Sequence, residues 1–180
     1  MAIDMQSLLW LFPISFMIHD FEEIVFWESW MAKNGPELTR RAPAFLTNLA
    51  NDFVRKSTAQ ISVTVFLIFC LTTVSALLAT AAEHWPLFLI LMSMFFLHGF
   101  GHIGQAILLR RYVPGLITSV LVVIPYGTWA TRRVLSAGIV DLSGLLVYLV
   151  VAVVLTPPFI LLMHMIGSYL YPRVLRSLIR

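Results

Sequence analysis

Long apolar runs separated by short polar connectors make up most of the chain. The runs lack the alternation of apolar and polar residues that is typical of membrane barrels, so they predict helices. A helix needs about 20 apolar residues to cross a bilayer. The pattern therefore predicts an all-α fold, a polytopic transmembrane helical bundle of about five spans. It forms a single domain, residues 1–180, with spans at about 7–31, 57–80, 86–109, 114–131 and 139–170.

Proline and glycine set the expected ends and bends of these spans. Asn34-Gly35-Pro36 is expected to end the first span, and the polar connector 32–56 contains a segment, 43–53, that fits an interfacial helix. Pro86 suits the first turn of the third span. The fifth run is too long to lie straight across the membrane, and Pro157-Pro158 predicts a kink or a break within it.

Composition agrees with a membrane location. Hydrophobic residues make up 59% of the chain and charged residues 12%, against about 45–50% and about 25% in soluble domains. Five spans place ten of the twelve Lys and Arg residues on one side, with only Arg132 and Arg133 on the other. This asymmetry predicts a plasma or inner membrane protein with its amino terminus outside and its carboxyl terminus cytoplasmic. The excess of basic residues indicates contact with membrane lipids, and no nucleic acid partner is expected.

Two spans carry ionisable side chains, which are costly in a membrane and usually functional there. His98 and His102 are four residues apart, so both imidazoles project from one helical face. His19, Glu22 and Glu23 repeat this arrangement in the first span. At 1.5 Å per residue, the two polar faces fall at matching depths. We therefore predict a metal site between spans one and three, with all five side chains as candidate ligands.

Imidazole nitrogens and carboxylate oxygens suit a divalent transition metal rather than calcium or magnesium, with zinc favoured and iron as the other candidate. Glu22 and Glu23 are also the candidate catalytic residues, since one would bind the metal and the other act as general base. The pattern does not decide which glutamate is the ligand. A hydrogen-bonded pair of Glu and His without metal stays open as the alternative.

Other polar residues extend this prediction. Gln60 and His164 are candidates to orient the metal ligands from outside the site. Asp20 points away from the polar face and is expected to hold another helix. Arg110 and Arg111 are candidates to bind a lipid phosphate, although a cluster that only sets orientation in the membrane explains them equally well.

The first of these motifs is similar to a known family signature. His19-Asp20-Phe21-Glu22-Glu23 resembles that of the HXXEE-motif family, multi-span membrane proteins of uncharacterised function. That family pairs it with Asn-x-x-x-His-x-x-x-His, which His98 and His102 match here, with Met94 in place of the asparagine. Residues 111–118 resemble the family's basic-aromatic-Pro-Gly segment. The resemblance covers about two thirds of the chain and implies that the two glutamates and three histidines are functional, without supplying a reaction.

These observations favour a membrane metalloenzyme, hydrolase-like, acting on a lipid or another apolar small molecule. The alternatives are a transporter or carrier of metal ions or protons that uses the same faces, and a di-iron or haem oxidoreductase. Five spans leave little room for alternating access unless the chain forms a homo-oligomer, so a homo-oligomer also stays open.

Overall fold

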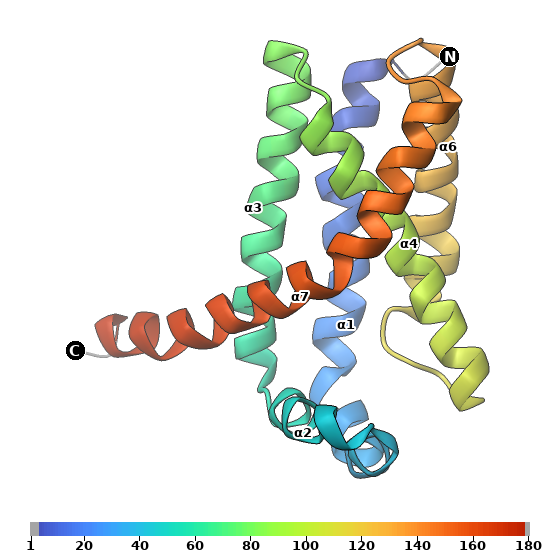
Figure 1. Ribbon diagram of the computed structural model, residues 1–180. Coiled ribbons are helices and arrows are strands. Elements are labelled where there is room, and N and C mark those ends of the chain that lie inside the picture. The colour runs from blue at the N-terminus through green and yellow to red at the C-terminus, as the bar shows by residue number, and fades with distance from the viewer. Residues whose placement is uncertain (1–3, 179–180) are drawn as a thin grey trace.

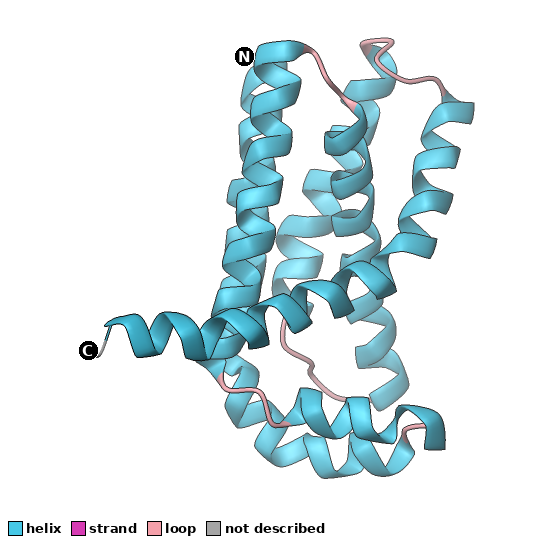
Figure 2. Cartoon of the chain, turned by 60° about the vertical axis from the view of Figure 1, so that its left-hand side comes forward, coloured by secondary structure: helices cyan, strands magenta, loops and turns pink. Residues whose placement is uncertain are grey.

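The protein is a bundle of helices, and no strand occurs in residues 4–178, the range that the computed structural model describes (Figures 1 and 2). The expected all-α class is confirmed. In chain order the elements are α1 (Met5–Arg41), the 3-10 turn η1 (Ala44–Leu46), α2 (Thr47–Val54), α3 (Thr58–Ala82), α4 (Pro86–Leu109), α5 (Leu116–Thr118), the π-helical turn η2 (Ser119–Val123), α6 (Ile124–Ser136) and α7 (Leu142–Leu178).

Within the described residues, three helices are long and apolar enough to cross a membrane. They are α3, α4 and the 142–175 part of α7, and they fit a membrane protein. The expected count of five spans is not confirmed. The first expected span lies in α1, which carries several acidic residues, and the fourth is divided among α5, η2 and α6.

Local sequence explains where α3 and α4 begin. Ser57 caps α3, since its hydroxyl accepts a hydrogen bond from the Gln60 amide at 3.3 Å while its own amide donates to the Gln60 side chain at 2.9 Å. Pro86 occupies the first turn of α4, where its missing N–H costs nothing. The predicted third span, 86–109, coincides with α4.

The expectation that Asn34-Gly35-Pro36 ends the first helix is wrong, because α1 continues to Arg41. Tertiary contacts hold this extension. The Arg111 guanidinium donates to the Asn34 side chain at 2.8 Å and to Glu37 at 2.9 Å. Gly35 lets α2 pack against α1, because a side chain there would collide with Val54. These contacts offset the cost of an internal proline.

The pair Pro157-Pro158 does not break the last helix. Residues 142–178 form one continuous α7, which bends so that its C-terminal part leaves the bundle sideways (Figures 1 and 2). A proline removes a backbone hydrogen bond and bends a helix without necessarily ending it. Of the two expected outcomes, the kink is confirmed and the break is not.

Aromatic packing fixes α1 against its neighbours on the side of the bundle away from α2. Phe12 is fully buried, and its ring lies 5.4 Å from Phe88 of α4 and 6.1 Å from Tyr126 of α6. Further along α4, a side chain at Gly99 would lie 2.8 Å from Val123, so the glycine allows η2 to approach closely. The polar residues of α1 and α4 are therefore held at a defined height between tightly packed helices.

Candidate metal centre

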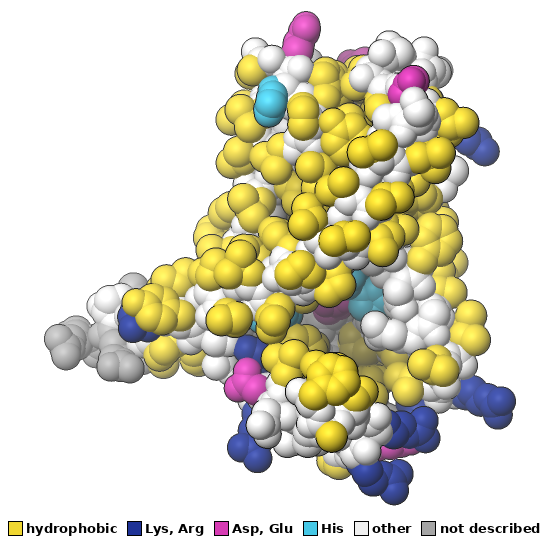
Figure 3. All heavy atoms as spheres, viewed as in Figure 1, with side chains coloured by type: hydrophobic (Ala, Val, Ile, Leu, Met, Phe, Trp, Pro, Cys, Tyr) yellow, Lys and Arg dark blue, Asp and Glu magenta, His cyan; other side chains and the backbone are white. Residues whose placement is uncertain are grey.

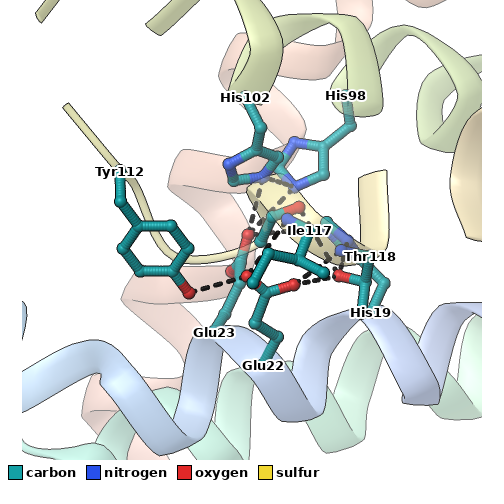
Figure 4. Close-up of polar contacts among 9 residues, drawn as sticks. His19, Glu22, Glu23, His98, His102, Tyr112, Ile117 and Thr118 are labelled. Carbon is teal, nitrogen blue, oxygen red and sulfur yellow. Dashed lines mark hydrogen bonds and ion pairs between the residues drawn. The ribbon is translucent and has the colours of Figure 1, made fainter. Parts of the chain in front are cut away.

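Four of the five predicted ligands meet between α1 and α4 (Figure 4). His19 and Glu23 come from α1, and His98 and His102 come from α4. Each offers one ligand atom, and these atoms all lie within 4.8 Å of one another. His19 is fully buried and His102 is 7% exposed. The matching depths that the sequence predicted for the two polar faces are thus present in the folded chain.

The distances within this cluster are short enough for the four side chains to hold one metal ion. Oε1 of Glu23 lies 2.7 Å from Nε2 of His102 and 3.3 Å from Nε2 of His98, and the two imidazole nitrogens are 2.8 Å apart. If both nitrogens donate a hydrogen bond to the carboxylate, neither has a lone pair left to accept one from the other. The 2.8 Å contact between the two imidazole nitrogens then has no hydrogen bond. Zinc–nitrogen bonds of about 2.0–2.1 Å give tetrahedral ligands a separation of about 3.3 Å. Nε2 of His19 lies 3.5 Å from the same Glu23 oxygen, so the observed spacings, 2.7 to 3.5 Å, lie on both sides of that value.

Thr118 sets the orientation of the His19 ring. Its hydroxyl lies 2.6 Å from Oε2 of Glu22 and 3.0 Å from Nδ1 of His19. A carboxylate only accepts, so the hydroxyl donates to Glu22 and must accept from Nδ1–H of His19. Nε2 of His19 then carries its lone pair toward the cluster. Among the described residues this buried nitrogen has no hydrogen-bond partner, so its lone pair is available to a metal ion.

Glu22 lies beside the cluster but binds the segment that follows α4 (Figure 4). Its carboxylate accepts from the Tyr112 hydroxyl at 2.6 Å and from the backbone amides of Thr118 and Ile117 at 2.7 and 3.2 Å. Burial and the neighbouring Glu22 raise the pKa of Tyr112, so its hydroxyl keeps the proton that it donates. Glu22 is not among the four grouped ligand atoms, and its predicted part as ligand or base stays a prediction.

Gly115 brings the same segment directly against the cluster. Its φ of +85° is a conformation that residues with side chains rarely adopt. A Cβ at this position would lie 2.9 Å from the His102 ring and 3.0 Å from both the His19 ring and the Glu23 carboxylate. Any side chain at this position would therefore collide with His19, Glu23 and His102.

A sequence profile described as a protein of unknown function with HXXEE motif matches residues 10–130. This is about two thirds of the chain and includes all four residues of the cluster. The chain belongs to this family. Comparison with curated proteins and with solved structures found no match. The residues of the HXXEE motif have different partners. His19 and Glu23 belong to the cluster, whereas Glu22 accepts a hydrogen bond from Thr118.

A cavity of about 320 Å³ adjoins the HXXEE cluster. Glu23, His98 and His102 form part of its wall, and aromatic and aliphatic side chains form most of the rest. Asp20 also faces this cavity. It is 6% exposed, and its Oδ2 has no hydrogen-bond partner among the described residues. The expectation that Asp20 holds another helix is not confirmed, since the residue lines the cavity and its Oδ2 has no hydrogen-bond partner in the described part of the chain.

The remaining predicted residues lie around the cluster. His164 lines the cavity and packs edge-on against Phe53, with ring centroids 4.8 Å apart. Gln60 caps α3 and does not line the cavity. Arg111 is paired with α1, and Arg110 ends α4 with a φ of 52°. The expected parts of His164 and Gln60 around the metal, and of the two arginines in lipid binding, stay predictions.

Tyr112, Gly115 and Thr118 are the site residues that sequence reasoning missed. They lie about 90 or more positions along the chain from Glu22 and Glu23, which they contact or adjoin. Spacing along one helix therefore cannot reveal them. The available signal was the segment 111–118, which resembles the family's basic-aromatic-Pro-Gly pattern but does not by itself place these residues beside the HXXEE motif.

Proposed function

We propose that the protein is an integral membrane metalloenzyme that binds one divalent transition metal and acts on an apolar substrate. One observation carries this proposal. Three imidazoles and a carboxylate converge at the wall of a largely apolar cavity that is large enough for a small molecule. A structural metal site needs no such cavity, whereas a catalytic site needs space for a substrate beside the metal.

The donor set favours zinc, with iron as the second candidate, because imidazole and carboxylate suit both. A zinc ion held there supplies Lewis acidity that activates water near neutral pH or polarises a carbonyl. His19, His98 and His102 provide the nitrogen ligands. Glu23 would complete the ligand set, and its carboxylate would also accept a proton from the attacking water. Glu22 acts through Thr118, which keeps Nε2 of His19 available.

The apolar wall favours hydrolase-like chemistry on a lipid-derived molecule. Phe16 and Phe95 line the cavity beside the cluster, with ring centroids 5.9 Å apart. Such a wall excludes bulk water and strengthens the electrostatic interactions of the few polar groups inside it. Only water admitted with the substrate would then react.

The test is the metal content of the full chain, purified in detergent without a polyhistidine tag and measured by plasma mass spectrometry. We expect about one metal per chain in the wild type. His98→Ala and His102→Ala should lose it, because each removes a nitrogen ligand. His84→Ala is the matched control, since His84 is exposed and lies outside the cluster. Circular dichroism and thermal unfolding show whether each variant stays folded.

The outcomes separate the alternatives. Zinc without visible colour leads to hydrolase assays on lipids, and iron leads to oxidation assays. A metal that exchanges within minutes favours a carrier, because a resident catalytic ion is retained. A folded wild type that takes up no metal even when supplied with zinc or iron, or a double variant that keeps its metal, contradicts the proposal.

A further inference from the structure

The cavity follows one face of α1 for most of the helix. Its wall includes Phe12, Phe16, Asp20, Glu23 and Trp27, spaced by about one helical turn, and continues to Met31. At 1.5 Å per residue this face is about 28 Å long. A volume of about 320 Å³ spread over such a length makes a narrow channel. That shape fits an extended hydrocarbon chain better than a compact ring system.

The two ends of the channel differ in chemistry. From the polar cluster toward Phe12, the wall is made of aromatic and aliphatic side chains such as Leu91, Phe95 and Ile68. Toward the other end it includes His164 and Gln105. An occupant whose apolar tail lies toward Phe12 therefore has its polar head beside the polar cluster.

Asp20 indicates what kind of head this is. Its carboxyl group is more than nine-tenths buried and faces the channel, and its Oδ2 has no partner among the described residues. A buried carboxyl oxygen without a hydrogen bond is costly, so a ligand that donates one gains from meeting it. Hydroxyl and amine groups donate. A carboxylate head does not, and it would also place a like charge beside Glu23.

The channel opens near the expected membrane surface. Figure 3 shows a recess between α7 and α2 with acidic and histidine atoms visible inside it. Phe45 of η1 and Leu49 of α2 are 84% and 42% exposed. Exposed apolar side chains on a short helix at this level suit the lipid headgroup boundary. A single-chain amphiphile therefore reaches the opening from the lipid layer, tail first.

We propose that the channel binds a single-chain amphiphile whose head is a hydroxyl or an amine, with its tail toward Phe12 and its head donating to Asp20. This inference rests on the proposed function only in naming the ligand as the substrate. Binding itself needs no turnover and can be measured apart from the metal.

The experiment uses the full chain in lipid nanodiscs with a decanol that carries a photoreactive diazirine near its tail end, since Asp20 and Phe12 are eight residues, about 12 Å, apart along α1. We expect labelled peptides from the tail half of the channel, around Phe12 and Phe95. Val65→Trp fills the channel from α3, where Val65 is 5% exposed, and should lower this labelling at least fivefold. Phe66→Trp is the matched control on the lipid-facing side of the same helix, where Phe66 is 61% exposed.

Head-group preference is tested with the alcohol, the amine, the acid and the plain hydrocarbon of equal length. The wild type should be labelled more strongly by the alcohol and the amine than by the other two. Asp20→Leu should remove that preference, because leucine accepts no hydrogen bond. Unlabelled alcohols compete with the probe, and each added methylene should lower the free aqueous concentration needed for competition about fourfold until the chain fills the channel.

Metal content measured on the same samples separates this inference from the proposed function. Channel labelling without metal supports the amphiphile site and contradicts the metalloenzyme. Labelling spread over the lipid-facing residues, equal in Val65→Trp and wild type, overturns the amphiphile site even when metal is present. Equal labelling by the acid and the alcohol overturns the assignment of the head group. If Val65→Trp does not fold, Ile68→Phe fills the same wall with a smaller change in volume.

Discussion

Glu22 and Glu23 are neighbours in the chain but meet different partners. Glu23 contacts the three imidazoles, whereas Glu22 accepts four hydrogen bonds from Tyr112, Ile117 and Thr118. Adjacent residues on a helix point about 100° apart, so two neighbouring carboxylates can serve two sites at once. Glu23 faces the candidate metal position, and Glu22 contacts Thr118, whose hydroxyl orients His19.

The hydroxyl of Thr118 carries this support, and its removal is a direct test. Thr118→Val keeps the shape of the side chain but neither accepts from His19 nor donates to Glu22. We expect the affinity for zinc to fall about 10- to 100-fold, as for other partners that orient metal ligands. Thr73→Val is the control, because its hydroxyl bonds only within its own helix, to the Phe69 carbonyl. Competition with a zinc chelator measures both variants, and equal affinities would show that Thr118 does not orient the ligand.

Gly115 tests how closely the loop rests on the cluster. Gly115→Ala places a methyl group about 3 Å from the His19 ring, the His102 ring and the Glu23 carboxylate. Gly138→Ala is a matched control, since Gly138 also has a positive φ, +68°, but a Cβ there meets nothing within 4 Å.

Both alanine variants should lose about 1 kcal/mol or more of unfolding free energy from backbone strain. Only Gly115→Ala should also lose the metal. Thermal unfolding and metal analysis on the same samples separate the two effects. Retention of metal by Gly115→Ala would mean that the loop moves away from the cluster at little cost.

At this scale the sequence predicted the residues that share a helix and missed those that do not. The spacing of His98 and His102, with His19 and Glu23 at the same depth, was enough to predict the cluster. No spacing rule places Thr118 beside His19, because that contact depends on how the segment after α4 folds back. Glu22 was grouped with Glu23 by proximity in sequence, and the structure shows its separate set of partners.

At the scale of elements, local signals predicted helices well and their ends less well. The 86–109 helix follows directly from its apolar run and from Pro86. The continuation of α1 past Asn34-Gly35-Pro36 does not, because Arg111 and Val54, from distant parts of the chain, hold it. Tertiary contacts of this kind override a local breaker, and a single sequence does not display them.

The contact between α1 and α2 can be tested at Gly35. In an isolated helix, glycine to alanine is stabilising by up to about 1 kcal/mol. Gly35→Ala should instead destabilise the protein by about 1–3 kcal/mol, because its methyl group collides with Val54 and the packed helices must separate. Gly104→Ala, where a Cβ meets nothing within 4 Å, should cause no loss. Thermal unfolding measures both, and a stabilised Gly35→Ala would contradict the packing.

At the scale of the whole molecule, charge and apolar surface divide the bundle into zones. Lys and Arg side chains gather around the end that carries α2, and apolar side chains cover the visible face above it (Figure 3). Three helices have the length and composition to cross a membrane. The rest of the bundle, α1 and the α5–η2–α6 segment, packs alongside them, so whether those two also cross decides between five spans and three.

The five-span and three-span topologies differ in whether Ala44 and Ala137 lie on opposite sides of the membrane. Ala44 lies in η1, beside α2, and Ala137 follows α6 at the opposite end of the bundle (Figure 1). If every long element crosses the membrane, the two residues face opposite sides. If only α3, α4 and α7 cross, both residues face the same side of the membrane, and α6 then cannot run beside α4 toward the opposite end of the bundle as it does in Figure 1.

Single cysteines at these positions, in a Cys70→Ala background, measure this arrangement with a membrane-impermeant thiol reagent. We expect Ala137→Cys to react in intact cells and Ala44→Cys to react only after permeabilisation, because the basic end should face the cytoplasm. The reverse pattern would keep five spans and overturn the orientation. Reaction of both on one side would favour three spans, and it would contradict the packing of α1 and α6 along the spanning helices.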